Sequence, residues 1–178
     1  MYVWDPLIRL AHWTLVSAVC VAWLSMEDIG LPHTWHEPAG YVATAVVLTR
    51  TVWGLIGRGH ARFTSFVRSP QAVLTYGQQV LRHAEPRYIG HNPLGGWMVI
   101  ALLACVAGIA CTGWLQTTDR YWGSEPLEIV HRSLAWGLLG LVTLHVSGVV
   151  FTSLRHKESL VRAMITGRKP VRSELDIH

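Results

Sequence analysis

The feature that most restricts the fold is a long uncharged stretch near the end of the chain, in which no Asp, Glu, Lys or Arg occurs from Ser133 to Leu154. About 20 apolar residues, each adding about 1.5 Å of helix, cross the hydrocarbon core of a bilayer, so this stretch is long enough. His131 stands just before it and His145 inside it, 14 residues apart. At about 100° per residue both imidazoles point to nearly the same helix face, roughly 21 Å apart along the axis. Because ionisable groups inside a membrane are costly, the pair is either functional or hydrogen-bonded as neutral side chains to neighbouring helices.

The composition of the whole chain agrees with a membrane location. Only 15% of the 178 residues are charged and 51% are hydrophobic, whereas ordinary soluble domains carry about 25% charged residues. The cysteines Cys20, Cys105 and Cys111 fall within apolar runs, where they serve as small hydrophobic residues. No C-x-x-C-H sequence occurs, which excludes covalent attachment of a c-type haem. The chain is therefore expected to be an all-α integral membrane protein.

Four apolar stretches predict a bundle of four transmembrane helices in a single domain over 1–178, with spans at about 7–26, 36–56, 94–115 and 129–154. The first stretch lacks the layout of a signal peptide, since acidic residues follow it, and is interpreted as a retained helix. Ser69-Pro70 and the helical spacing of the apolar residues after it predict a short amphipathic helix on the membrane surface. The basic tail, 155–178, is expected to carry a second interfacial helix around Leu160 to Ile165.

Basic residues are distributed unevenly between the two sides of this arrangement. Twelve of the fifteen Lys and Arg residues lie at the N-terminus, between the second and third spans, and in the tail. Because basic residues stay on the cytoplasmic side, both termini are expected to be cytoplasmic. The opposite loops hold only Arg120 and Arg132, beside five acidic residues. The net charge of +4 is explained by this asymmetry rather than by nucleic-acid binding.

Four histidines match in depth, two by two. The first span runs outward, which puts His12 about a turn inside the cytoplasmic edge, level with His145 of the fourth span. The second span starts outside, which puts His36 level with His131 near the outer edge. An inner pair and an outer pair are therefore expected. Core packing alone explains such matching poorly, although a structural role for the four residues is the alternative.

These pairs suit haem iron, which takes an imidazole nitrogen on each face of the porphyrin. An iron with both axial positions filled is suited to electron transfer rather than to oxygen binding. Zinc is the competing metal, but it ordinarily needs a third or fourth ligand close by, and no such cluster stands out in the sequence. The sequence therefore favours two b-type haems, one in each half of the membrane.

Three further residues are candidates for contact with a cofactor. Arg50 follows His36 by 14 residues, so it returns to nearly the same face, where it would either pair with a haem propionate or extend to the interface. Arg9 is a second candidate at that level. His91, in GHNPLGG before the third span, would cap the helix, approach a propionate or bind a quinone, with a plain boundary histidine as the alternative.

Several stretches resemble the bacterial di-haem cytochrome b561 family, which includes hydrogenase-type cytochrome b subunits. They are VWDPLIRLAHW at the start, HEPAGY followed by LTRTVWGLIG, then RYIGHNPLGG, and the fourth span with its H-x13-H spacing. Together they cover almost the whole chain. The resemblance implies that the ligands of two b haems are the four residues that match in depth, His12 with His145 and His36 with His131. Hydrogenase-type subunits often have an additional span, so this compact chain looks closer to the short members of the family.

The resemblance also implies a role in a respiratory chain. Electrons would pass between the membrane quinone pool and a periplasmic c-type cytochrome or dehydrogenase module, in a bacterial inner membrane. The resemblance leaves open whether the chain forms a homodimer and whether the chain itself has quinone oxidoreductase activity. Some relatives act alone as superoxide:quinone oxidoreductases, an alternative that the few basic outer residues favour less because an anion needs a basic approach surface. A non-haem transporter or scaffold is a further alternative, which purified protein without a Soret band would favour.

Overall fold

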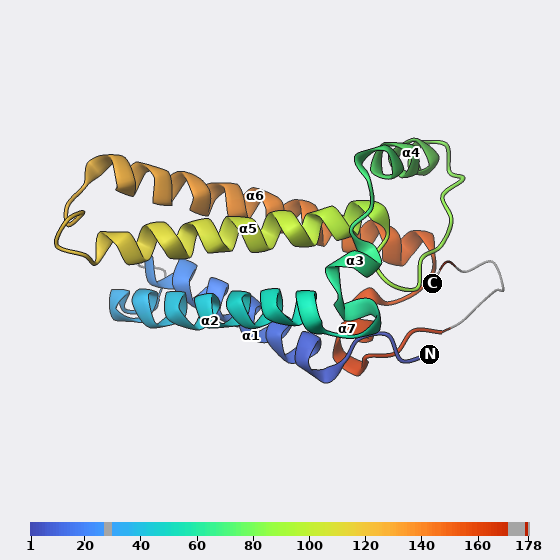
Figure 1. Cartoon of the computed structure of the whole chain (residues 1–178), viewed down its shortest axis with the longest axis horizontal. Coiled ribbons are helices and arrows are strands. Elements are labelled where there is room, and N and C mark those ends of the chain that lie inside the picture. The colour runs from blue at the N-terminus through green and yellow to red at the C-terminus, as the bar shows by residue number, and fades with distance from the viewer. Residues whose placement is uncertain (27–29, 171–176, 178) are drawn as a thin grey trace. The chain divides into compact units, whose positions relative to one another are not determined.

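The computed structural model describes residues 1–26, 30–170 and 177. Its longest helices are α1 (Pro6–Met26), α2 (His36–Ile56), α5 (Pro93–Gln116) and α6 (Glu125–Arg155) (Figure 1). All four are long and apolar enough to cross a membrane, so the predicted four-span, all-α fold is confirmed. The fourth helix begins at Glu125, one turn before its predicted start at 129. Two acidic residues after the first span, Glu27 and Asp28, and Arg172 and His178 in the tail lie outside the described residues.

The shorter elements include both helices that were predicted outside the spans. The first is α4 (Pro70–Leu81), where the Ser69 hydroxyl accepts a hydrogen bond from the Ala72 amide at 3.3 Å. The second is α7 (Leu160–Thr166). Their location at the membrane surface stays a prediction. The single turns η1 (His33–Trp35), η2 (Gly59–Ala61) and α3 (Phe63–Phe66) were not predicted, because one turn leaves too little periodicity in a sequence.

The chain folds as two compact units, and each of the four long helices continues from one unit into the other. Unit 1 comprises Met1–Arg9, Val52–Ala101 and Thr143–His178, and unit 2 comprises Leu10–Thr51 and Leu102–Val142. The expectation of a single domain stays a prediction. In unit 2 all four long helices contribute to one core, whose buried residues are Ala18, Ala43, Val47, Val106 and Leu138. Two of these five residues, Ala18 and Ala43, are small residues that let helices approach closely.

Unit 1 holds both ends of the described chain. The Val3 and Trp4 amides donate to the Gly167 carbonyl at 2.8 and 3.2 Å, and the N-terminal ammonium group donates to the Lys169 carbonyl at 2.8 Å. The core of the unit consists of Val3, Trp4, Ile89 and Ala163. The start of the chain and the segment after α7 are therefore fixed to each other by backbone hydrogen bonds.

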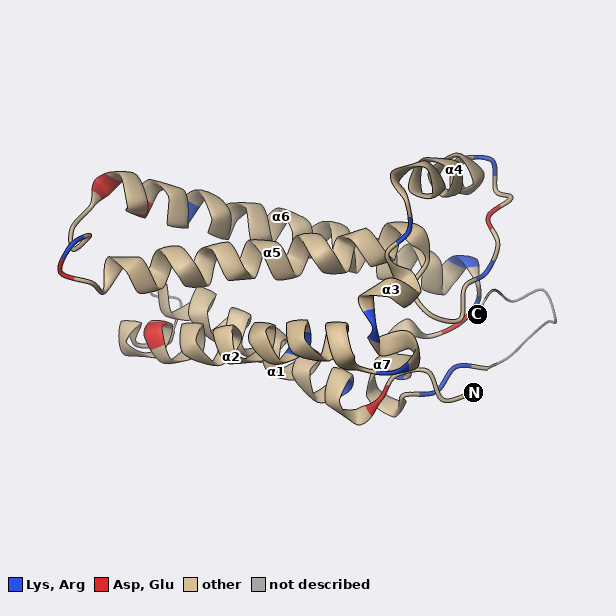
Figure 2. Ribbon diagram, viewed as in Figure 1, with Lys and Arg blue, Asp and Glu red and all other residues tan. Residues whose placement is uncertain are grey.

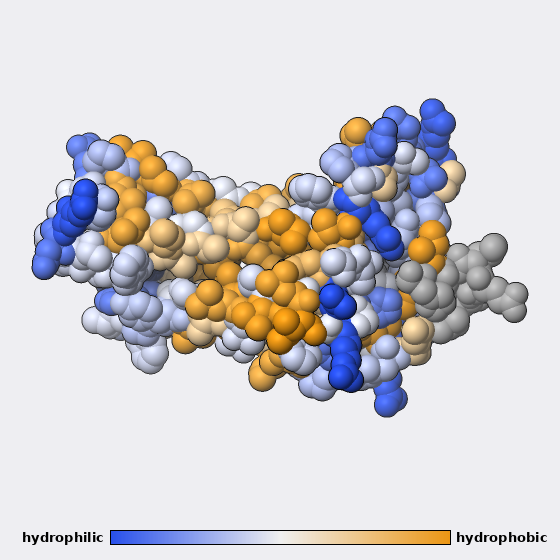
Figure 3. All heavy atoms as spheres, viewed as in Figure 1, coloured by the Kyte–Doolittle hydropathy of each residue, from blue (hydrophilic) through white to orange (hydrophobic). Residues whose placement is uncertain are grey.

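Large hydrophobic side chains are exposed along the long helices. Leu55 is 62% exposed and Leu154 is 74% exposed. Figure 3 shows hydrophobic residues over the middle of the long helices and hydrophilic residues over the loops. A soluble protein rarely exposes apolar surface on this scale, whereas in a bilayer these side chains face acyl chains. The protein is thus a multi-pass membrane protein.

A buried ion cluster fastens the segment that follows α6. The Glu158 carboxylate accepts a hydrogen bond from Arg87 at 2.6 Å, and Lys169 Nζ lies 3.4 Å from it. The three side chains are only 3%, 11% and 5% exposed. Burial by itself would raise the pKa of Glu158, but the hydrogen bond from Arg87 and the positive charge of Lys169 outweigh it and lower that pKa below its ordinary 4.5.

Glu158→Gln is expected to lower the midpoint of thermal unfolding in detergent at pH 7. Two buried cations would lose their carboxylate, at a cost of about 3 kcal/mol. A carboxylate with a depressed folded pKa stabilises the fold fully above its unfolded pKa, and this contribution disappears as the pH falls through the folded pKa. The difference between wild type and variant should therefore be constant above about pH 5.5 and shrink below about pH 4.5. Glu37→Gln, at an exposed position, is the matched control, and a Glu158 effect that does not change with pH would contradict the assignment.

Candidate functional site

His36 is the first residue of α2 and is held against α1. Its Nδ1 lies 2.9 Å from the carbonyl oxygen of Ala22, near the end of α1. A carbonyl oxygen only accepts hydrogen bonds, so Nδ1 carries the proton and Nε2 of the neutral ring keeps its lone pair. The hydroxyl of Ser25, which is fully buried, donates to the same carbonyl at 3.0 Å. The imidazole is thus fixed in the tautomer that a metal ligand needs.

His131, in the second turn of α6, is held in the same tautomer by α5. Its Nδ1 lies 2.9 Å from Thr112 Oγ1. The single hydroxyl proton of Thr112 is directed to the carbonyls of Gly108 and Ile109, at 2.9 and 3.0 Å. The hydroxyl oxygen therefore accepts from Nδ1, which again leaves the Nε2 lone pair available. Gly113 makes room for the ring, because a Cβ there would lie 3.1 Å from His131 Cε1.

The two rings face each other within unit 2. Their centroids are 6.2 Å apart, and their planes meet at 70°. When two imidazoles bind one metal from opposite sides, each metal–nitrogen bond is about 2 Å long and each ring centre lies roughly 1 Å beyond its nitrogen. The two ring centroids are then about 6 Å apart. Gly40, one turn after His36, has no heavy atom within 4 Å of the place where a Cβ would lie. The outer pair therefore has the spacing for one shared metal, and α2 is uncrowded at Gly40.

The donor set of this pair consists of two imidazoles. Among the described residues, no group of three or more His, Cys, Asp or Glu side chains is arranged to hold a metal ion. Structural zinc ordinarily takes four such ligands, whereas haem iron needs from the protein only its axial ligands. The observed pair fits haem iron.

The inner pair is divided between the units. His12 belongs to unit 2, half-buried on α1, with its ring edge-on to Trp13 at 5.0 Å between centroids. His145 belongs to unit 1, half-buried on α6. The pairing of these two residues stays a prediction.

The two arginines named from the sequence have different surroundings. Arg50 is buried on α2, with 8% of its surface exposed. Arg9 donates from Nη1 to the Ile165 carbonyl at 2.6 Å, in the last turn of α7, where helix carbonyls lack partners within the helix. Contact of either guanidinium with a haem propionate stays a prediction.

His91 precedes α5 but is not its cap. Asn92 has that role, because its Oδ1 accepts a hydrogen bond from the Gly95 amide at 2.7 Å. The His91 ring instead packs between Trp4 and Phe66, with centroid distances of 4.7 and 4.6 Å. It also lines a small cavity in unit 1.

Sequence reasoning missed the groups that orient the two outer imidazoles. Thr112 lies in an apolar helix without a distinctive pattern around it, and the Ala22 carbonyl belongs to the backbone, so neither gives a sequence signal. His33 stands in η1 with its ring parallel to that of His36, at 5.9 Å and 3°. This stack follows from the single turn that places residues 33 and 36 on one side.

A membrane-spanning helical bundle with two imidazoles spaced for one metal suits a membrane cytochrome. The family model described as prokaryotic cytochrome b561 matches residues 3–167, and the chain belongs to this family. Its members are b-type cytochromes, so the protein binds haem b and transfers electrons within the membrane.

Curated relatives are similar along nearly their whole length. A protein of Bradyrhizobium diazoefficiens is 23% identical over 216 residues, covering 97% of this chain and 87% of the relative. Proteins of Azotobacter vinelandii and Cupriavidus necator are 26% and 24% identical, covering 94% and 93% of this chain and 87% and 85% of the relatives. All three are described as a "probable Ni/Fe-hydrogenase B-type cytochrome subunit". The 216 aligned residues exceed the 178 of this chain, so the Bradyrhizobium protein contains insertions that this chain lacks. No solved structure shows a significant match.

Proposed function

We propose that this chain is a di-haem b-type cytochrome that carries electrons across the bacterial inner membrane, between the quinone pool and a redox partner on the outer side. The observation that supports it best is the outer pair, in which His36 and His131 are 6.2 Å apart and both Nδ1 atoms are engaged in hydrogen bonds. His12 and His145 would hold the second haem. Because His131 and His145 share one helix, their levels differ by roughly 21 Å.

The residues of the chain act on a bound haem through position and hydrogen bonding. Haem supplies reversible one-electron exchange at its iron. The Ala22 carbonyl and the Thr112 hydroxyl accept from the imidazoles, which raises their basicity as ligands and fixes the ring orientation. The apolar surface of the surrounding helices would keep water away from a bound haem.

The charge distribution supports cytoplasmic termini and an outer redox partner. Glu37, Asp119 and Glu125 belong to unit 2, and Figure 2 shows acidic residues at the loop between α5 and α6, on the predicted outer side. Most Lys and Arg residues belong to unit 1. An acid-rich outer end gives little attraction for superoxide, so electron delivery by a protein partner is favoured. The relatives are described as hydrogenase subunits, and we infer a hydrogenase-like module or a c-type cytochrome as the partner.

The proposal is tested in proteoliposomes that contain the purified protein and a quinone. Hexaammineruthenium(II), an impermeant one-electron donor, is added outside, and the haem bands and quinone absorbance are followed together. We expect the haem and the quinone both to be reduced, and the quinone not to be reduced in empty liposomes. Reduction of the haem without any reduction of the quinone would contradict the quinone part of the proposal.

Thr112→Val is expected to raise the midpoint potential of the outer haem. Valine has nearly the same shape but no hydroxyl to accept from His131 Nδ1, so the imidazole becomes a weaker donor to iron and the ferric form loses stability. Loss of a hydrogen bond to a metal ligand changes the affinity for the metal by about tenfold. A tenfold change corresponds to about 59 mV in the midpoint potential of a one-electron couple. A redox titration of the α-band measures this. Thr112→Ser keeps the hydroxyl and should keep the wild-type potential, and equal potentials in all three proteins would remove Thr112 from the site.

A further inference from the structure

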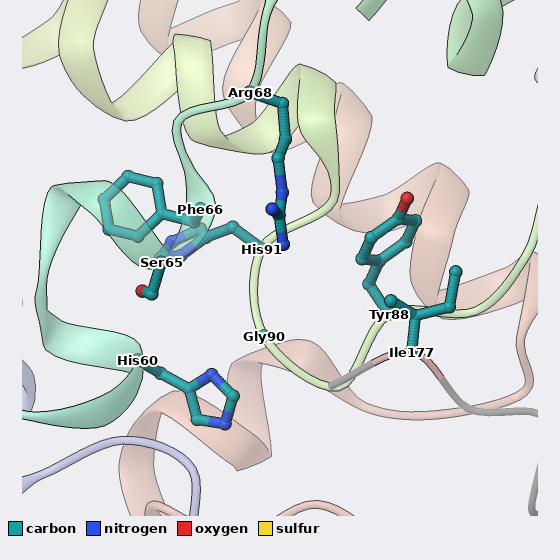
Figure 4. Close-up of a pocket in the computed structure, with 8 residues that line it drawn as sticks. All are labelled: His60, Ser65, Phe66, Arg68, Tyr88, Gly90, His91 and Ile177. Carbon is teal, nitrogen blue, oxygen red and sulfur yellow. The ribbon is translucent and has the colours of Figure 1, made fainter. Parts of the chain in front are cut away.

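Unit 1 contains a small cavity to which electron transfer gives no role. It is lined by His60, Ser65, Phe66, Arg68, Tyr88, Gly90, His91 and Ile177 (Figure 4). Its interior of about 10 Å³ is the size that holds one water molecule, which needs two to four polar partners. The lining offers two imidazoles, a guanidinium, a phenol and a hydroxyl, which suit an enclosed water.

His91 is fixed on one side of this cavity. Its ring lies between Trp4 and Phe66, which are only 5% and 3% exposed. Two buried aromatic residues therefore determine where the imidazole points. The residue directly precedes Asn92, the cap of α5, so the ring stands at the start of a membrane-spanning helix.

His60 reaches the same cavity from η2, a different part of the chain. A Cβ on Gly90 would lie 2.9 Å from His60 Nδ1, so only glycine at position 90 lets the imidazole lie this close to the backbone. Gly90 is the neighbour of His91 in the sequence. Two imidazoles from separate segments thus border one water-sized space.

The lining of the cavity also includes Arg68 and Tyr88. Arg68 extends its guanidinium into the same region (Figure 4), and a guanidinium does not deprotonate in proteins. Tyr88 packs edge-on against Tyr76 at 5.6 Å. Imidazole is the lining group that both takes up and releases protons near pH 7.

We propose that His60, an enclosed water and His91 form a proton-transfer site that serves the quinone reaction on the inner side of the membrane. The inference rests on the proposed function. Conversion of a quinone to a quinol takes up two electrons and two protons and forms two O–H bonds, and electrons that arrive through haem iron bring no protons. Each proton comes from the aqueous phase on the side of the termini. Each imidazole takes it on one ring nitrogen and releases one from the other, so both are unchanged after a turnover.

The test compares two electron acceptors, of which only one needs protons. The full chain in lipid nanodiscs is reduced with dithionite and mixed in a stopped-flow instrument with decylubiquinone or with ferricyanide. In His60→Gln and His91→Gln, reoxidation by the quinone is expected to slow by about tenfold or more, with oxidation by ferricyanide unchanged. Gly90→Ala, which displaces the His60 ring but keeps both imidazoles, should also slow the quinone reaction alone. Free imidazole should restore part of the rate in His60→Ala.

The matched control is His83→Asn, at an exposed position with a φ of 58°, a conformation that asparagine tolerates. It should react like wild type with both acceptors. Wild-type rates with quinone in His60→Gln and His91→Gln would overturn the proton-transfer site while leaving the proposed function intact. Equal slowing with both acceptors would also overturn it, because that result indicates a structural role. A wild-type protein that reacts with ferricyanide but never with quinone would overturn the quinone function and this inference together.

Discussion

His131→Ala is expected to lose the outer haem and to stop electron transfer from an outer donor to quinone. Haem content should fall from two per chain to one. Removal of groups that only orient a metal ligand lowers affinity or activity about 10- to 100-fold, so loss of the ligand itself should reduce the transmembrane rate at least about 100-fold. Alanine is the best helix former, so α6 should remain intact. Haem quantification and the proteoliposome assay with hexaammineruthenium(II) measure the two effects.

The matched control for this variant is His33→Ala. His33 stacks on His36 at 5.9 Å but is exposed and is not a predicted ligand, so two haems should remain in that variant. A His131→Ala protein with full haem content and an unchanged rate would show that the outer ligand lies elsewhere.

Gly167→Ala is expected to destabilise unit 1 strongly. Gly167 ends α7 with a φ of 77°, which costs a residue with a Cβ about 1–2 kcal/mol. That Cβ would also lie 2.7 Å from the backbone oxygen of Trp4. Because the Val3 and Trp4 amides donate to the Gly167 carbonyl, the backbone has no easy way to move aside. A total loss of about 3 kcal/mol is expected, measured as a lower midpoint of thermal unfolding in detergent.

Gly77→Ala provides the comparison for this substitution. Gly77 lies within α4, with open space where a Cβ would be placed. Alanine there should be neutral or stabilising by up to about 1 kcal/mol. If Gly167→Ala unfolds at the same temperature as Gly77→Ala, the contact between the two ends of the chain is not as described.

The parts of the fold that could be predicted are those with a long, regular signal. Apolar stretches of about 20 residues gave the four spans, because a bilayer requires that length. Ser69-Pro70 located α4 because a cap and a first-position proline act locally. The outer pair was expected because depth in a membrane follows directly from position along a helix, and His36 and His131 do lie together.

The parts that could not be predicted depend on contacts between segments far apart in the sequence. Thr112 becomes an acceptor for His131 only because α5 packs beside α6 at that point. His60 and His91 meet at one cavity because Gly90 lets a distant imidazole approach the backbone. Neither contact is marked by a periodic pattern in the sequence, and single turns such as η1 are too short to produce one. Residues that orient or connect functional groups were therefore missed, whereas the candidate ligands were named from their depth, and their role as ligands stays a prediction.

The measurement that most directly tests the pairing of four histidines around two haems is a count of haem in wild type and in His145→Ala. Detergent-purified protein is reduced with dithionite, the reduced-minus-oxidised spectrum is recorded, and haem is quantified as the pyridine haemochrome. Two b haems per chain are expected in wild type, falling to about one in His145→Ala with the spectrum of the outer haem retained. A wild-type protein without a Soret band, or a His145→Ala protein with full haem content, would contradict the pairing.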